Sequence, residues 1–153
     1  MRCVLLSQKK PFSVETLQSL PFETVHIIAG ENFSQLKRAF YDVPFVTVEK
    51  NPFWKSTKDG FELALAFDLS KEDDFVWSVD VGSVTSILPF YDPEVNAIAL
   101  KNGNPVGGIV LKQYNDTGRR AIKKALYRNC KATIEELIEN ILLYLLPIRK
   151  VIL

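Results

Sequence analysis

The sequence of 153 residues contains one histidine and two cysteines, which is very little of either. Cys3 and Cys130 are too few for a disulfide framework or a zinc site, and this use of cysteine is typical of a reducing, cytoplasmic compartment. His26 lies within an apolar run, TVHII, and a histidine-based catalytic triad has no other candidate. We therefore interpret His26 as a packed or strand-edge residue and expect chemistry, if there is any, to use other side chains.

Long apolar runs are also missing. The most apolar stretch, ILLYLLP from Ile141, is far shorter than the ~20 residues that span a bilayer. The N-terminal MRCVLLS leads almost directly to Lys9 and Lys10, which is too short an apolar run for a secretory signal. The phosphate-binding pattern Gly-x-x-x-x-Gly-Lys-Ser/Thr is absent as well. We expect neither a membrane partner nor classical nucleotide hydrolysis.

Charge of neither sign dominates, because the formal net charge is +1. This balance gives no reason to expect a specific nucleic-acid partner. The halves differ, however: residues 1–100 carry 9 Lys or Arg against 14 Asp or Glu, and residues 101–153 carry 10 against 4. A basic helix is expected over 116–131, and we interpret it as a solvated face or a contact with an acidic partner, with phosphate binding as the alternative. Its cations are Arg119, Arg120, Lys123, Lys124, Arg128 and Lys131.

The chain does have ample apolar material, since 47% of its residues are hydrophobic, enough for one core in a single domain over 1–153. Short β-rich runs alternate with helical patterns up to residue 90. The expected strands are CVLL from Cys3, TVHIIA from Thr24, FVTVE from Phe45 and FVWSVD from Phe75. Expected helix N-caps are Ser13, Asn32 paired with Gln35, and Ser56 paired with Asp59. This alternation predicts a three-layer α/β/α fold with a mostly parallel central sheet.

The pattern changes after residue 90. Two further runs, VNAIAL from Val95 and GGIVL from Gly107, flank the turn signal Asn102-Gly103 and predict a hairpin or an antiparallel addition to the sheet. A last helix is expected from Thr133, which forms a capping box with Glu136, and the terminal IRKVIL is expected to be a short strand. The apolar stripe of that helix predicts either a core face or the interface of a homo-oligomer or protein partner.

In a parallel α/β sheet, ligands bind beyond the carboxyl ends of the strands. That rule selects the segments 7–10, 30–31, 49–58 and 80–83. Asp80 is the sharpest candidate, because it follows the apolar run FVWSV and precedes a turn that Gly82 permits. A carboxylate there is well placed for a divalent cation that would hold a diphosphate. The alternative is that Asp80 only caps the next turn.

The stretch KSTKDGFELALAFDLSKEDDFVWSVDVGS from Lys55 resembles the centre of GT-A type nucleotide-sugar glycosyltransferases, in which a helix leads to an acidic turn, a hydrophobic strand and an Asp-x-Asp motif. The run SVETLQSLPFETVHIIAGEN from Ser13 is similar to that family's first helix and second strand. The resemblance covers residues 2–112 and is one of order and spacing. It implies a nucleotide-diphospho-sugar transferase fold and a nucleotide or nucleotide-sugar ligand.

The resemblance also implies particular contacts. Nucleotide-binding residues would be Ser7, Gly30, Lys58, Asp59, Asp80 and Gly82, and a Mg²⁺ or Mn²⁺ ion would be held by Asp80. The chain departs from the family where Gly82 replaces the second carboxylate of Asp-x-Asp, and it ends before the region that builds the family's acceptor site. Two hypotheses follow: a minimal or degenerate transferase that binds a nucleotide, or a non-catalytic regulatory or interaction module that keeps the fold. Trp54 could stack on a base or sugar, whereas Trp77 is expected in the core.

Overall fold

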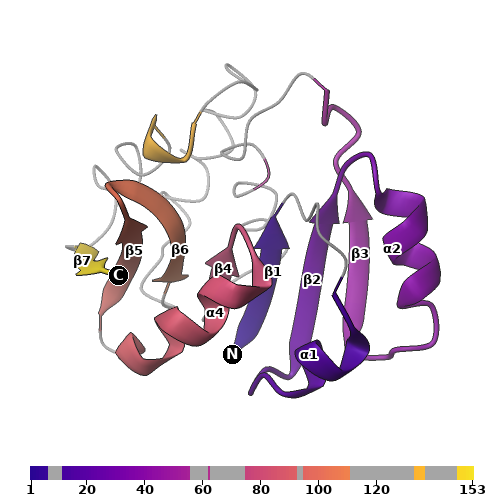
Figure 1. Cartoon of the computed structure of the whole chain (residues 1–153), viewed down its shortest axis with the longest axis horizontal. Coiled ribbons are helices and arrows are strands. Elements are labelled where there is room, and N and C mark those ends of the chain that lie inside the picture. Colours follow the sequence, from indigo (N-terminus) through magenta and orange to yellow (C-terminus); the bar gives the residue numbers. More distant parts are fainter. Residues whose placement is uncertain (7–11, 56–61, 63–74, 93–94, 111–132, 137–147) are drawn as a thin grey trace.

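A computed structural model describes residues 1–6, 12–55, 62, 75–92, 95–110, 133–136 and 148–153 (Figure 1). The strands in these ranges are β1 (Arg2–Leu6), β2 (Thr24–Ala29), β3 (Val46–Lys50), β4 (Phe75–Ser78), β5 (Asn96–Lys101), β6 (Asn104–Val110) and β7 (Ile148–Ile152). The helices are α1 (Val14–Gln18), α2 (Phe33–Ala39) and α4 (Val81–Ile87), which continues into the 3₁₀ turn η1 (Leu88–Phe90).

The seven strands form one sheet in the order β3-β2-β1-β4-β6-β5-β7 (Figure 1). Strands β1 to β4 are parallel to one another, β6 runs antiparallel to both of its neighbours, and β7 is parallel to β5. The sheet is therefore mostly parallel, as the alternation of strands and helices predicts. From β1 the chain builds β2 and β3 on one side and then places β4 on the other side.

Both faces of the sheet are covered. In β1 the side chains of Cys3 and Leu5 point to one face and those of Val4 and Leu6 to the other, and all four are fully buried. Helices α1, α2 and α4 pack on the first face, where their buried residues share one apolar cluster with β1, β2 and β3. Burial on both faces explains why these strands read as continuous apolar runs instead of alternating patterns.

The hairpin of β5 and β6 confirms the turn expected at Asn102-Gly103. Both residues have positive φ, 53° and 79°, which is the conformation of a two-residue hairpin turn that asparagine and glycine tolerate best. Within β6 a Cβ at Gly107 would lie 2.6 Å from the carbonyl oxygen of Trp77, and one at Gly108 would lie 2.6 Å from the Trp77 ring nitrogen. Two glycines thus let β6 fit beside β4 and beneath the indole, which is 3% exposed.

Of three expected helix caps in the described residues, two form as predicted. Ser13 caps α1, since its hydroxyl accepts the Thr16 N–H at 3.2 Å, and Thr133 accepts the Glu136 N–H at 3.2 Å. Asn32 is the N-cap residue of α2, as predicted, but the predicted side-chain cap is wrong: the Asn32 side chain makes no capping hydrogen bond, and its backbone (φ −89°, ψ 14°) is not in the extended conformation typical of an N-cap.

The helix predicted from Ser56, the basic helix 116–131 and the last helix beyond residue 136 lie outside the described residues. Ile134, at the start of the expected apolar stripe, is buried. Among the helices that the structure describes, none combines the length and the apolar character needed to cross a bilayer.

Candidate functional site

The carboxyl ends of β1, β2, β3 and β4 meet at one edge of the sheet, which we call the carboxyl edge. Between β1 and β4 the order of the strands reverses, because the chain runs β1 to β3 in one direction and then returns to the far side of β1. Such a switch point leaves a crevice between the loops that follow the two strands. Asp80 lies at this point, two residues after β4 ends.

Asp80 is the N-cap of α4. Its backbone is extended (φ −154°, ψ 159°), and one carboxylate oxygen accepts the Ser83 N–H at 2.8 Å while the other accepts the Ser83 hydroxyl at 2.9 Å. The expected alternative, that Asp80 caps the next turn, is therefore confirmed by its hydrogen bonds. The side chain remains exposed, and each carboxylate oxygen has a second lone pair beyond the one that Ser83 uses. Capping consequently leaves Asp80 able to bind a ligand.

Ser78 holds the turn that presents Asp80, a role that its position in an apolar run does not predict. The serine is fully buried at the end of β4, and its hydroxyl donates to the carbonyl of Asp80 and accepts the Asp80 N–H at 3.2 Å. The Val79 N–H donates to the Val106 carbonyl of β6 at 3.2 Å. The only signal in the sequence is one hydroxyl in the apolar run FVWSV.

Gly30 follows β2 and lies against Trp54, which follows β3. A Cβ at Gly30 would be 2.9 Å from the Trp54 Cβ and 3.2 Å from its Cγ, so only glycine lets the two loops approach this closely. The Asn51 N–H donates to the carbonyl of Ala29 at 2.8 Å and extends the β2–β3 pairing by one step. These contacts place the segments after β2 and β3 side by side at the carboxyl edge.

A buried polar pair lies beneath these loops. Asn51 is fully buried and Glu62 is 4% exposed, and the Asn51 amide Nδ2 donates to Glu62 Oε1 at 3.4 Å. The amide oxygen of Asn51 accepts the Phe53 N–H at 3.0 Å, which closes a short turn. Sequence reasoning missed this pair, because the two residues are polar positions that only the fold brings together.

The structure places three of the six expected nucleotide contacts at the carboxyl edge: Gly30, Asp80 and Gly82. Gly82 is exposed in the first turn of α4, and Asp80 Oδ1 lies 3.2 Å from the position its Cβ would take. Gly30 and Asp80 follow strands that both pair with β1, and those two strands are about 10 Å apart across two strand spacings. Ser7, Lys58 and Asp59 lie outside the described residues.

The histidine and the buried cysteine of the described residues lie in the strands, away from this edge. His26 hydrogen-bonds through Nδ1 to the Thr47 hydroxyl of β3, as expected for a strand residue. Burial lowers the pKa of His26, the nearby Arg2 lowers it further, and Glu49 acts in the opposite direction. Burial raises the pKa of Cys3 to about 12, so its thiol is a packed group and not a nucleophile.

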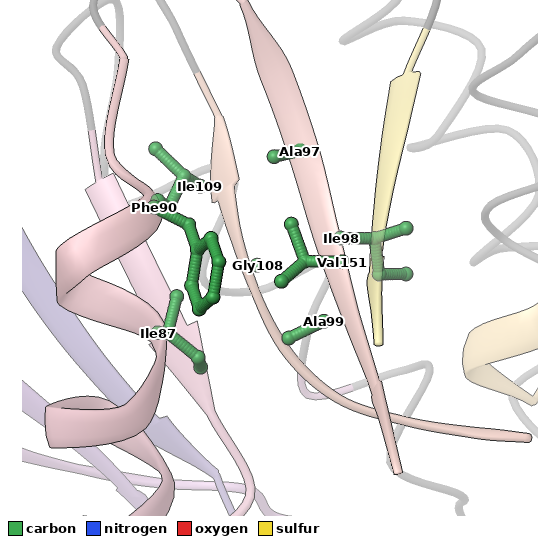
Figure 2. Close-up of a pocket in the computed structure, with 8 residues that line it drawn as sticks. All are labelled: Ile87, Phe90, Ala97, Ile98, Ala99, Gly108, Ile109 and Val151. Atoms are coloured by element: carbon green, nitrogen blue, oxygen red, sulfur yellow. The ribbon is translucent and has the colours of Figure 1, made fainter. Parts of the chain in front are cut away.

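A second feature of the surface is an apolar hollow between η1 and the strands β5, β6 and β7 (Figure 2). Ile87 and Phe90 form one side of it, and small side chains such as Ala97 and Ala99 form its floor (Figure 2). Its volume is about 160 Å³ even when space open to solvent is included. Ligand pockets are usually larger than ~300 Å³ and contain polar groups, so the hollow is a packing feature.

Solved structures with the same fold define the class of this domain. The inositol-1-phosphate CTP transferase from T. maritima has a TM-score of 0.65 at 7% identity, covering 99% of this chain and 84% of that one. UDP-glucose pyrophosphorylase in complex with UDP-glucose has a TM-score of 0.53 at 9% identity, covering 97% and 89%. Rv0371c from Mycobacterium tuberculosis H37Rv, in complex with manganese, has a TM-score of 0.51 at 12% identity, covering 99% and 86%.

No protein-family model matches the sequence, and no curated protein is similar to it. The structural neighbours establish a nucleotide-diphospho-sugar transferase-like fold, which confirms the predicted fold class. They include a CTP transferase and a pyrophosphorylase. The fold is therefore broader than the glycosyltransferases that the sequence resembles, and membership of that narrower group stays a prediction.

Proposed function

We propose that this domain binds a nucleoside diphosphate or a nucleotide sugar at the carboxyl edge, with the phosphates beside Asp80. One observation carries the proposal: Asp80 lies at the switch point between β1 and β4, where open α/β sheets bind their ligands. The similar structures of a CTP transferase and of a pyrophosphorylase with UDP-glucose support the choice of ligand. Gly30 and Gly82 would allow the ligand to approach the backbone, and Ser7, Lys58 and Asp59 complete the proposed set.

A Mg²⁺ or Mn²⁺ ion would arrive with the phosphates. Asp80 has free lone pairs for such an ion, but among the residues that the structure describes no three His, Cys, Asp or Glu side chains gather to hold one. Most of the metal ligands would therefore be phosphate oxygens and water, as is usual for Mg²⁺. The manganese complex of Rv0371c supports this choice of ion.

The second candidate function is ligand binding without group transfer, and Gly82 is the residue that favours it. It replaces the second carboxylate that an Asp-x-Asp motif would supply, which removes one metal ligand and weakens any stabilisation of a leaving diphosphate. In that case the domain would be a regulatory or interaction module that keeps the fold, and the helices expected near its C-terminus would contact a protein partner or a second copy.

Thermal unfolding with UDP-, GDP- and CDP-sugars, each with and without Mn²⁺, tests the proposal. A ligand at 100 times its dissociation constant adds about 2.7 kcal/mol, which corresponds to a rise in Tm of about 5–10 °C for a domain of this size. Asp80→Asn should remove the dependence on Mn²⁺. Ser13→Ala, which removes the cap of α1 near the amino ends of the strands (Figure 1), should bind as the unchanged protein does. The absence of a shift with every ligand would refute the proposal.

A further inference from the structure

The turn after β3 is anchored from inside the protein. Asn51 is fully buried, and its side chain both accepts the Phe53 N–H and donates to the buried Glu62, while its own N–H donates to Ala29. Buried amide and carboxyl groups cost free energy unless they are hydrogen-bonded, and a satisfied polar network holds a single geometry. The pair therefore gives the turn Asn51–Lys55 a defined position against the end of β2.

The anchored turn presents an aromatic ring to solvent. Phe53 is 57% exposed, although its backbone is fixed. The Phe53 N–H donates to the side-chain oxygen of Asn51, and the Trp54 N–H donates to the backbone carbonyl of Asn51 at 3.3 Å. An ordered backbone beneath an exposed ring loses little conformational entropy when a ligand binds the ring.

Two lysines lie at the same part of the carboxyl edge. The Lys55 Nζ lies 5.3 Å from the centre of a Trp54 ring, and the Lys50 Nζ lies 5.9 Å from that of Phe33 at the start of α2. Aromatic rings interleaved with cations are the composition that binds nucleotides, in which the rings stack on bases and the cations attract phosphates.

We propose that Phe53 is the residue on which the nucleobase stacks, and that Asn51 and Glu62 are positioning residues that hold its turn. The inference rests on the proposed function and adds to it the part of the site that distinguishes a nucleotide from a bare diphosphate. Phe53 follows β3 and Asp80 follows β4, strands that are three spacings or about 14 Å apart, so a ligand that contacts both must lie extended along the carboxyl edge.

The first test compares binding of UDP, GDP and CDP with that of inorganic pyrophosphate by isothermal titration in Mn²⁺. Phe53→Ala should weaken the best nucleotide about 5- to 150-fold and leave pyrophosphate unchanged, because stacking on one ring is lost. Phe53→Tyr should retain the affinity. Tyr41→Ala, which removes a ring 87% exposed beyond the far end of α2, is the matched control and should bind normally.

These outcomes separate the two proposals. If the unchanged protein binds none of the nucleotides, the proposed function and this inference both fail. If it binds a nucleotide and Phe53→Ala binds it equally well, only the stacking role is overturned. Equal weakening of nucleotide and pyrophosphate would also overturn it, since a loss of stacking cannot affect a ligand that has no base.

The second test addresses the anchor. Asn51→Asp should weaken the nucleotide, because a second carboxylate would face Glu62 and repel it. Combining Asn51→Asp with Glu62→Gln exchanges the amide and the carboxylate, and should restore both the hydrogen bond and the affinity. Ile109→Val, a core change away from the turn, should lower stability and leave affinity intact. If the combined variant stays as weak as Asn51→Asp alone while both remain folded, the positioning role is refuted.

Discussion

Replacing Asp80 separates its structural contribution from its proposed ligand. In Asp80→Ala both hydrogen bonds from Ser83 are lost, the N–H bond of 2.8 Å and the hydroxyl bond of 2.9 Å, and the first turn of α4 loses its cap. Loss of an N-cap of this kind costs about 1 kcal/mol, within a range of about 0.5–2. Asp80→Asn keeps an oxygen that accepts the Ser83 N–H, and its amide can donate to the Ser83 hydroxyl. We therefore expect the asparagine variant to lose less than about 0.5 kcal/mol, because asparagine and aspartate cap equally well.

Urea unfolding measures these differences, with a lower midpoint and an unchanged m-value for Asp80→Ala. In thermal scans the same loss corresponds to about 2–4 °C. Ser13→Ala, which removes the cap of α1, should lose a similar amount and serves as a reference. If Asp80→Asn is as unstable as Asp80→Ala, the hydrogen bonds that cap α4 do not explain the contribution of Asp80 to the free energy of unfolding.

Two further predictions concern the sheet. Gly107→Ala would place a methyl group 2.6 Å from the Trp77 carbonyl oxygen, so we expect a loss of about 1–3 kcal/mol in urea unfolding, and an unchanged midpoint would show that β6 can shift away. His26 has its pKa lowered in the folded protein from its ordinary 6.5, chiefly by burial. The unfolded chain therefore binds more protons as the pH falls below about 6.5, and stability should decrease there. Urea midpoints measured from pH 7.5 to pH 5 should fall more for the unchanged protein than for His26→Gln, and an equal fall in both would contradict the lowered pKa.

The strands were predictable because burial on both faces leaves little but apolar residues in them. Val4 and Leu5 point to opposite faces and are both fully buried, so even a short run is recognisable. Helix α4 was not predicted, since VGSVTSI is rich in residues that form helices poorly. It forms because Asp80 caps it and because its buried side chains, Val84 and Ile87, pack on the sheet.

The order of the last strands was open from the sequence. A hairpin can join a sheet through either strand, and here β6 pairs with β4 because its glycine pair admits the Trp77 indole and the Ile87 side chain. For the site, Asp80 and Gly30 could be selected because the ends of parallel strands are recognisable. The Asn51–Glu62 pair could not, since nothing in either local pattern indicates that the two residues meet.

Binding of a nucleotide at the carboxyl edge can be followed residue by residue. Amide chemical shifts in ¹⁵N-labelled protein, titrated with the nucleotide and Mn²⁺ replaced by diamagnetic Mg²⁺, test it most directly. We expect the largest changes at Gly30, Trp54 and the segment from Asp80 to Ser83, and none at the hairpin turn of Asn102 and Gly103. Changes confined to the hairpin turn or to the strands around the apolar hollow would contradict it.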